Sequence, residues 1–252
     1  PDRVMVDVEN LTLADGSVRD VNFHARSGEI TGIAGLVGCG KSELIRAIYG
    51  IERTSTGTIR IGGAPYESPT ARHSLKRGVA YFPANRIAEG LALSRPIREN
   101  ASMTGLDLPA FARFGIIRQA AERVTIAGIM QQLQLRPPNI ERSAGALSGG
   151  NRQKVMLGRA LTRELTVFLF DEPSVGIDVG AKLEVYEFMK RLVEAGAAVI
   201  VVSSELPEVL ALSNRLYVMH QGRIAAELTG TEKTEQNVLS SFFREHLTAE
   251  VA

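Results

Sequence analysis

A glycine-rich segment at residues 35–42 constrains the fold of this chain more than any other feature. It reads Gly-Leu-Val-Gly-Cys-Gly-Lys-Ser, and it lies between the apolar run 30–34 and a helix-like segment at 42–49. Glycines let a loop turn its backbone N–H groups inward, and the start of a helix adds partial positive charge at the same place. The order strand, glycine-rich loop, helix predicts a phosphate-binding loop in an α/β fold. Without the flanking strand and helix, the same loop sequence would also fit an ordinary turn.

Each part of this loop has a predicted role toward ATP. The ammonium group of Lys41 is expected to reach the β and γ phosphates, and the hydroxyl of Ser42 is expected to bind Mg²⁺. The residues expected to surround the nucleotide phosphates are Gly35, Gly38, Cys39, Gly40, Lys41 and Ser42. Since Cys39 is the only cysteine, no internal disulfide can form, and a reducing compartment is indicated. Alkylation of this thiol should block nucleotide binding.

A second feature is the apolar segment 167–170, which ends in two carboxylates. A buried parallel strand presents its carboxyl end to the ligand crevice, so acidic residues there are placed for chemistry. Asp171 is predicted to hold Mg²⁺, and Glu172 is predicted to act as the general base that polarises the attacking water. By itself a strand that ends in Asp-Glu fits a turn or a helix cap equally well, but the neighbouring phosphate loop favours the catalytic interpretation.

The rest of the chain alternates short apolar segments with amphipathic ones, which predicts a mainly parallel sheet. Predicted strands lie at 30–34, 79–82, 167–170, 198–202 and 215–219, and helical periodicity marks 181–194. Residues 4–8 and 21–24 are predicted edge strands of an antiparallel β subdomain. The segment 85–160 lacks strand-like runs and predicts helices at 97–103 and 118–135. We therefore expect a nucleotide-binding core at 1–84 and 161–228, a helical subdomain at 85–160 and a helical extension at 229–252.

Composition excludes several classes of partner and fold. The chain has 252 residues, 44% of them hydrophobic, and a formal net charge of +1. That length and composition suffice for a full hydrophobic core. A charge this small creates no general field that would attract nucleic acid, so no nucleic-acid partner is expected. The sequence also holds no apolar run of the length that spans a bilayer.

A third motif is Leu147-Ser148-Gly149-Gly150, which opens a predicted helix that runs to about residue 161. Ser148 could simply be the N-cap of that helix. With the two motifs above, however, the chain resembles the ATP-binding cassette ATPases, whose signature sequence is this Leu-Ser-Gly-Gly stretch. The resemblance implies a P-loop core with an inserted helical subdomain. It also implies that Ser148, Gly149 and Gly150 contact ATP held by a second cassette, not the ATP at Lys41.

Three further segments indicate a subgroup of this family. The segments 171–182, 203–208 and 218–223 look like the second half of the fused double-cassette ATPases that drive bacterial monosaccharide import. The resemblance implies several partners: an N-terminal cassette of the same polypeptide, membrane permease subunits and, indirectly, a periplasmic sugar-binding protein. It places the chain at the cytoplasmic face of the inner membrane, and Pro1 fits a cassette cut from a tandem polypeptide. Asp178 matches the aspartate that communicates across the cassette dimer, although it could equally be a helix N-cap.

Two positions depart from the family pattern. Ala84 stands where most cassette ATPases carry a metal-contacting glutamine, so water or Asn85 would have to complete the metal shell. Ser204 aligns with a histidine that contacts the γ phosphate, and a hydroxyl cannot carry the imidazolium charge. These departures leave two hypotheses open. One is an ATP-hydrolysing motor that uses Glu172, Lys41 and Ser204, and the other is a nucleotide-dependent clamp whose own site is slow or inactive.

Overall fold

The computed structural model describes residues 3–67 and 69–242, and these fall into two compact units. Among the described residues, the core unit comprises 3–67, 69–81, 166–173 and 184–242, and the helical unit comprises Phe82–Leu165 and Ser174–Leu183. The division assigns the predicted helical segment 85–160 to the helical unit, together with residues 82–84, 161–165 and 174–183. Residues 243–252, part of the predicted C-terminal extension, lie outside the described residues, as does Pro1.

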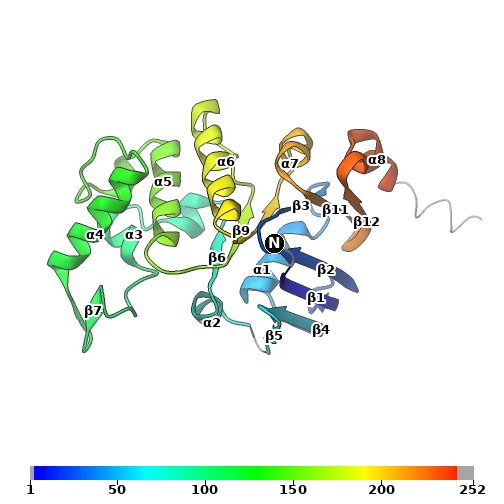
Figure 1. The fold of residues 1–252 in the computed structure, drawn as a ribbon, viewed down its shortest axis with the longest axis horizontal. Helices are drawn as coiled ribbons and strands as arrows, with labels where there is room; N and C mark the ends of the chain where they lie inside the picture. Colours follow the sequence, from blue (N-terminus) through cyan, green and yellow to red (C-terminus); the bar gives the residue numbers. More distant parts are fainter. Residues whose placement is uncertain (1–2, 68, 243–252) are drawn as a thin grey trace, which may run out of the picture. The chain divides into compact units, whose positions relative to one another are not determined.

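A six-stranded sheet with the order β12-β11-β3-β10-β9-β6 forms the centre of the core unit (Figure 1). Its strands are β3 (Ile30–Gly35), β6 (Val79–Phe82), β9 (Val167–Asp171), β10 (Ala198–Val202), β11 (Arg215–His220) and β12 (Arg223–Thr229). Strand β3 pairs in parallel with both β10 and β11, and β10 pairs in parallel with β9. All five predicted strands are confirmed. Strands β9 and β10 are buried along their whole length, which explains their continuous apolar sequence.

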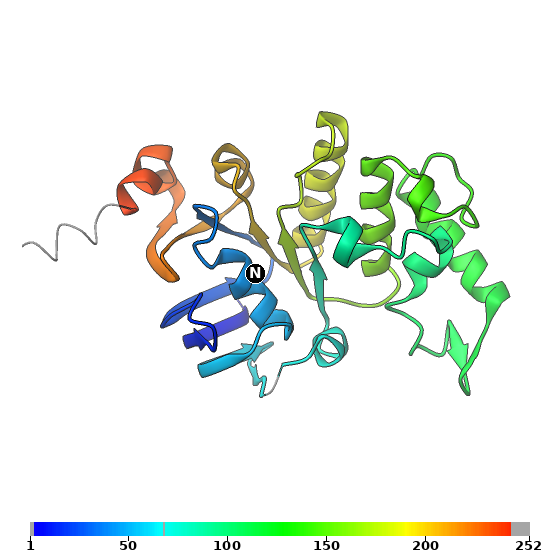
Figure 2. The ribbon, with the colours of Figure 1, turned by 180° about the vertical axis from the view of Figure 1, so that it is seen from behind.

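The second sheet of the core unit is four-stranded and has the order β2-β1-β4-β5 (blue to cyan in Figure 2). Its strands are β1 (Val4–Leu13), β2 (Val21–Arg26), β4 (Thr54–Ile61) and β5 (Ala64–Pro65). The prediction that residues 4–8 form an edge strand is wrong, because β1 pairs with β2 on one side and with β4 on the other. Strand β4 escaped prediction because its first five residues are all exposed and show no apolar alternation.

Helices follow the strands of these sheets along the chain. They are α1 (Lys41–Tyr49), α2 (Ala71–Lys76), α6 (Val179–Glu194), α7 (Leu206–Leu212) and α8 (Glu235–Ser241). Apolar residues of α1 share one core with buried residues of both sheets, and this core includes Leu44 and Ile48. A separate apolar cluster joins Val209 of α7 and Val238 of α8 to strands β11 and β12. Among the described residues no helix is both long enough and apolar enough to cross a membrane.

The helical unit is built on α3 (Ile97–Ser102), α4 (Gln119–Gln132) and α5 (Gly149–Ala160), which contact one another. These helices confirm the predictions at 97–103 and 118–135 apart from their end residues. The segment was expected to contain no strands, yet a small hairpin joins β7 (Ala112–Arg113) to β8 (Ile116–Ile117). Strands of two residues are too short to produce a readable alternation. A π-helical turn lies at Arg86–Gly90, and 3₁₀ turns lie at Ala144–Ala146 in this unit and Gly230–Glu232 in the core unit.

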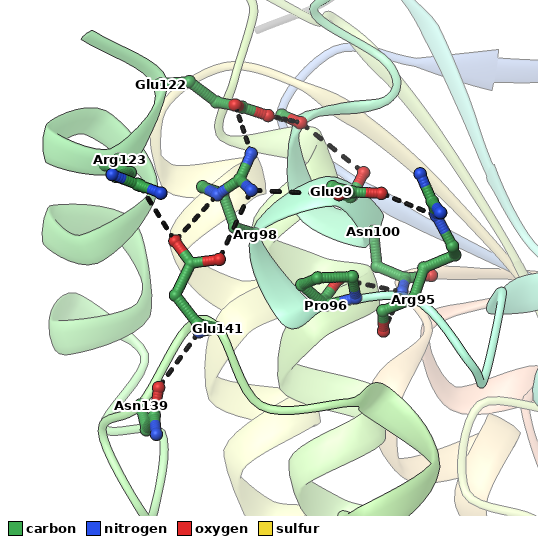
Figure 3. Close-up of polar contacts among 10 residues, drawn as sticks. Arg95, Pro96, Arg98, Glu99, Asn100, Glu122, Arg123, Asn139 and Glu141 are labelled. Atoms are coloured by element: carbon green, nitrogen blue, oxygen red, sulfur yellow. Dashed lines mark hydrogen bonds and ion pairs between the residues drawn. The ribbon is translucent and has the colours of Figure 1, made fainter. Parts of the chain in front are cut away.

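A buried ion pair ties α3 to α4 in the helical unit (Figure 3). The guanidinium of Arg98 donates to Glu122, whose side chain is only 2% exposed, and the Ser102 hydroxyl donates to the same carboxylate at 2.5 Å. Arg98 also donates to the half-exposed Glu141, with 2.9 Å between Nε and Oε1. Without Glu122, Arg98 would keep the carboxylate of Glu141 as a counter-ion. Without Arg98, the buried carboxylate of Glu122 would keep the neutral hydroxyl of Ser102.

We predict that Arg98→Met lowers the free energy of unfolding by about 3–5 kcal/mol, because it leaves the buried charge of Glu122 without its cation. Adding Glu122→Gln to Arg98→Met should restore part of that stability, since a neutral amide needs no counter-ion. Urea unfolding of the single and double variants measures both effects. A double variant less stable than Arg98→Met alone would contradict this account of the pair.

Candidate functional site

The phosphate-binding loop lies between β3 and α1, as predicted. Gly38 and Gly40 have φ angles of 79° and 99°, which L-residues with a side chain rarely adopt. A Cβ atom at Gly40 would lie 2.4 Å from the carbonyl oxygen of Ser17, whereas a Cβ at Gly38 would meet nothing within 4 Å. Gly40 is the N-cap of the nine-residue helix α1 and offers no side-chain cap. The first N–H groups of α1 thus keep the donor capacity that phosphates use.

Lys41, Glu172 and Ser204 meet at the carboxyl ends of the central strands. The ammonium nitrogen of Lys41 donates to the Ser204 hydroxyl at 3.0 Å and lies 3.6 Å from Oε1 of Glu172. Ser204 in turn donates its hydroxyl to Oε1 of Glu172 at 2.5 Å and its backbone N–H to Oε2 at 3.0 Å. Both oxygens of the Glu172 carboxylate are therefore held by one serine. The structure brings together the three residues that the sequence predicts to be catalytic.

The backbone of Glu172 is strained. Its φ angle is 45°, in the left-handed region, although it carries a full side chain. This conformation costs a residue other than glycine about 1–2 kcal/mol. The N–H group of Glu172 donates to the carbonyl of Val202 at the end of the neighbouring strand β10, with a distance of 2.9 Å. The turn that follows β9 is thus fixed in a costly conformation, and the carboxylate of Glu172 is held near Lys41.

Asp171, the last residue of β9, is only 3% exposed, and each oxygen of its carboxylate accepts a hydrogen bond. The Ser42 hydroxyl donates to Oδ1 at 2.8 Å, and the Tyr81 hydroxyl donates to Oδ2 at 3.1 Å. Burial raises the pKa of the Asp171 carboxyl, and these two hydrogen bonds lower that pKa in part. Tyr81 was not among the predicted site residues, although it is the one polar side chain in the predicted strand 79–82.

The donor set at Asp171 fits Mg²⁺. Ser42 and Asp171 contribute hard oxygen atoms that lie 2.8 Å apart, and Mg²⁺ is usually bound by one or two protein ligands together with phosphates and water. The described residues contain no group of three or more His, Cys, Asp and Glu that could hold a metal ion by themselves. Phosphate oxygens of a nucleoside triphosphate, together with water, could supply the remaining ligands.

In the helical unit the glycines of the signature sequence lie close to the loop 176–178. A Cβ atom at Gly149 would lie 3.0 Å from the carbonyl oxygen of Gly176, and one at Gly150 would lie 3.9 Å from a carboxylate oxygen of Asp178. Ser148 caps α5, because its hydroxyl accepts from the backbone N–H and the side-chain amide of Asn151. The carboxylate of Asp178 accepts from the N–H of Ala181 at 3.0 Å, as an N-cap does. Both capping alternatives are confirmed, and they leave the proposed contacts with a second cassette open.

The structure bears differently on two other sequence-based expectations. The amide oxygen of Asn85 accepts from the N–H groups of Ile87 and Ala88, so it already caps the π-helical turn, and water becomes the simpler choice to complete a metal shell. Cys39 is 5% exposed, and burial raises the pKa of its thiol. A buried thiol with a raised pKa forms little thiolate at neutral pH. The expected alkylation of Cys39 must therefore be slow in the folded chain.

We predict that Gly40→Ala destabilises the loop far more than Gly38→Ala does. Both alanines suffer the strain of a positive φ, about 1–2 kcal/mol, but only the one at position 40 also overlaps a backbone carbonyl. Thermal unfolding and titration with a fluorescent ATP analogue measure the difference. Gly38→Ala should still bind the analogue, and Gly40→Ala should not. Equal loss in both variants would show that the close approach of Ser17 is unimportant.

Comparisons with known proteins agree with this geometry. The family described as ABC transporter matches residues 18–175, more than half of the chain. The ribose import ATP-binding protein RbsA 2 of Streptomyces coelicolor is 40% identical over 236 residues, which cover 94% of this chain and 45% of that protein. The ribose import ATP-binding protein RbsA of Bacillus subtilis is 39% identical over 234 residues, which cover 93% of this chain and 47% of that protein. The chain thus spans about half the length of these curated relatives.

Solved structures show the same fold. An ATP-binding cassette of an ABC transporter, MJ1267, superposes with a TM-score of 0.80 and 23% identity, covering 95% of this chain and 98% of that one. A cassette solved as a dimer in a post-hydrolysis state with ADP and Pi, MJ0796, superposes with a TM-score of 0.76 and 20% identity, covering 89% of this chain and 98% of that one. The expected α/β fold, with a mainly parallel sheet and an antiparallel subdomain, is confirmed.

Proposed function

Because the chain belongs to the ABC transporter family, we propose that it binds and hydrolyses ATP and thereby energises sugar import through a membrane permease. The observation that carries this proposal is the junction of Lys41, Glu172 and Ser204 beside the pair Ser42 and Asp171. The curated relatives are named for ribose import, which supports a sugar as the transported substrate. We further propose that the chain acts at the cytoplasmic face of the membrane, as a peripheral subunit.

Each residue of the site in the core unit would have its own role in the reaction. Lys41 would exchange its contact with Ser204 for the β and γ phosphates of ATP, and Ser42 and Asp171 would hold Mg²⁺. Bound Mg²⁺ would neutralise charge on those phosphates. Glu172 would take a proton from the attacking water as general base. Ser204, which reaches both oxygens of Glu172, would fix the direction in which that carboxylate points.

A second cassette would complete the site. Ser148, Gly149 and Gly150 lie at the N-terminus of α5, where a hydroxyl and backbone N–H groups suit a phosphate. We propose that these residues contact ATP bound by the partner cassette, and that Asp178 contributes at the same interface. The dimer described for MJ0796 supports such a pairing. In a protein as long as the ribose-import relatives, the partner cassette would belong to the same polypeptide, and a periplasmic sugar-binding protein would act through the permease.

The alternative function is a nucleotide-dependent clamp whose own site hydrolyses ATP slowly or not at all. Two residues favour it: Ala84 offers no metal ligand, and Ser204 offers no imidazolium to the γ phosphate. In this alternative the chain would still bind ATP and complete the partner's site through Ser148. Lys41, Ser42, Asp171 and Glu172 are all present, however, and their arrangement supports hydrolysis.

The two functions predict different effects of Glu172→Gln in the full-length protein reconstituted with its permease. Under the hydrolytic proposal ATP turnover falls by about 10²-fold or more, because the general base is lost, while binding of a fluorescent ATP analogue is retained. The matching glutamate-to-glutamine change in the partner cassette is the control. Unchanged turnover with Glu172→Gln, together with loss of turnover in the control, would establish the clamp instead.

A further inference from the structure

The hydroxyl of Tyr81 contacts the carboxylate that the proposed function assigns to Mg²⁺. Tyr81 lies on β6, the edge strand next to β9, and its hydroxyl donates to Oδ2 of Asp171 at 3.1 Å. The other oxygen of Asp171 accepts from the Ser42 hydroxyl at 2.8 Å. Tyr81 and Ser42 thus reach Asp171 on different oxygens, so a metal that took the place of the Ser42 contact at Oδ1 would leave the Tyr81 contact intact.

The ring of Tyr81 is located by the same helix that carries Ser42. It packs against the ring of Tyr49, with 5.4 Å between ring centroids and an angle of 31° between planes. Tyr49 is the last residue of α1, and Ser42 is the second. One rigid element therefore sets the position of the hydroxyl expected to bind the metal and the position of the ring that directs the Tyr81 hydroxyl.

The carboxylate of Asp171 needs this second donor. Asp171 is 3% exposed, so little water is available to an oxygen that loses its hydrogen bond. Mg²⁺ requires a nearly ideal octahedral geometry. Hydrogen bonds to a metal-binding carboxylate orient it for the ion. From these contacts we propose that Tyr81 is a positioning residue that orients Asp171 for Mg²⁺, an inference that rests on the proposed metal site.

The test compares Tyr81→Phe with the unmodified full chain in binding a fluorescent ATP analogue at stepped concentrations of Mg²⁺. The phenylalanine keeps the ring that packs on Tyr49 and removes only the hydroxyl. The Mg²⁺ concentration at half-maximal effect should rise by about 10-fold, the usual result of removing a group that orients a metal ligand. Binding of the analogue in EDTA should not change, because the hydroxyl acts through the metal.

The matched control is Tyr66→Phe. The hydroxyl of Tyr66 also lies in the core unit, where it bonds with Ser74 and with the carbonyl of Thr70. Because this hydroxyl bonds with Ser74 and Thr70 and not with Asp171, the variant should leave the Mg²⁺ midpoint unchanged. If Tyr81→Phe leaves the midpoint unchanged, or weakens analogue binding equally with Mg²⁺ and with EDTA, Tyr81 has no role toward the metal. If the unmodified chain shows no response to Mg²⁺, the proposed metal site fails, and the role of Tyr81 fails with it.

Discussion

The site depends on one constraint: the buried carboxylate of Asp171, which ends β9, must accept hydrogen bonds where little water reaches it. Every residue of that strand is buried, so Asp171 leaves the core with nearly all of its surface covered. A buried carboxylate without donors is unfavourable by several kcal/mol. The donors to Asp171 are the hydroxyl of Ser42, on α1, and the hydroxyl of Tyr81, on β6. The adjacent carboxylate of Glu172 accepts from Ser204, which follows β10. These hydrogen bonds therefore hold α1, β6 and the segment after β10 beside the end of β9.

This arrangement also implies what a nucleotide must displace. In the structure Lys41 donates to Ser204 and lies beside Glu172, and Ser42 donates to Asp171. Phosphate oxygens and Mg²⁺ would compete with these internal partners for the same two side chains. The hydrogen bonds from Ser204 to Glu172 involve neither Lys41 nor Ser42, so they can persist after the exchange. The carboxylate of Glu172 would then stay oriented while its cationic neighbour turns to the ligand.

Much of the core unit could be predicted because its signals are local. The glycine loop, the apolar run before Asp171 and the helix that starts at Lys41 are each encoded within a few residues. Strand β4 could not be predicted, because its exposed residues are held by pairing with β1 rather than by an apolar face. For the same reason β1 was mistaken for an edge strand. Pairing partners far apart in the chain leave no local pattern.

The candidate site shows the same limit. Lys41, Ser42, Asp171 and Glu172 stand in motifs, but the contact of Tyr81 with Asp171 joins two strands that are distant in sequence and adjacent in the sheet. Ser148 and Asp178 illustrate the opposite case. Their role as helix caps could be predicted from spacing, and the structure confirms it, yet a cap is compatible with a contact to a second cassette. Local patterns identify such residues without fixing everything that they contact.

The central claim is that Ser42 and Asp171 bind the metal of a nucleotide whose phosphates are held by Lys41. A crystal structure of the chain with a non-hydrolysable ATP analogue and Mn²⁺, whose anomalous scattering locates the ion, tests this claim most directly. We predict that the anomalous peak places the ion in contact with the Ser42 hydroxyl. The Asp171 carboxylate should bind the ion directly or through one water, and the ammonium of Lys41 should have moved from Ser204 to the phosphates. Bound nucleotide with the ion away from both residues, or with Lys41 still donating to Ser204, would contradict it.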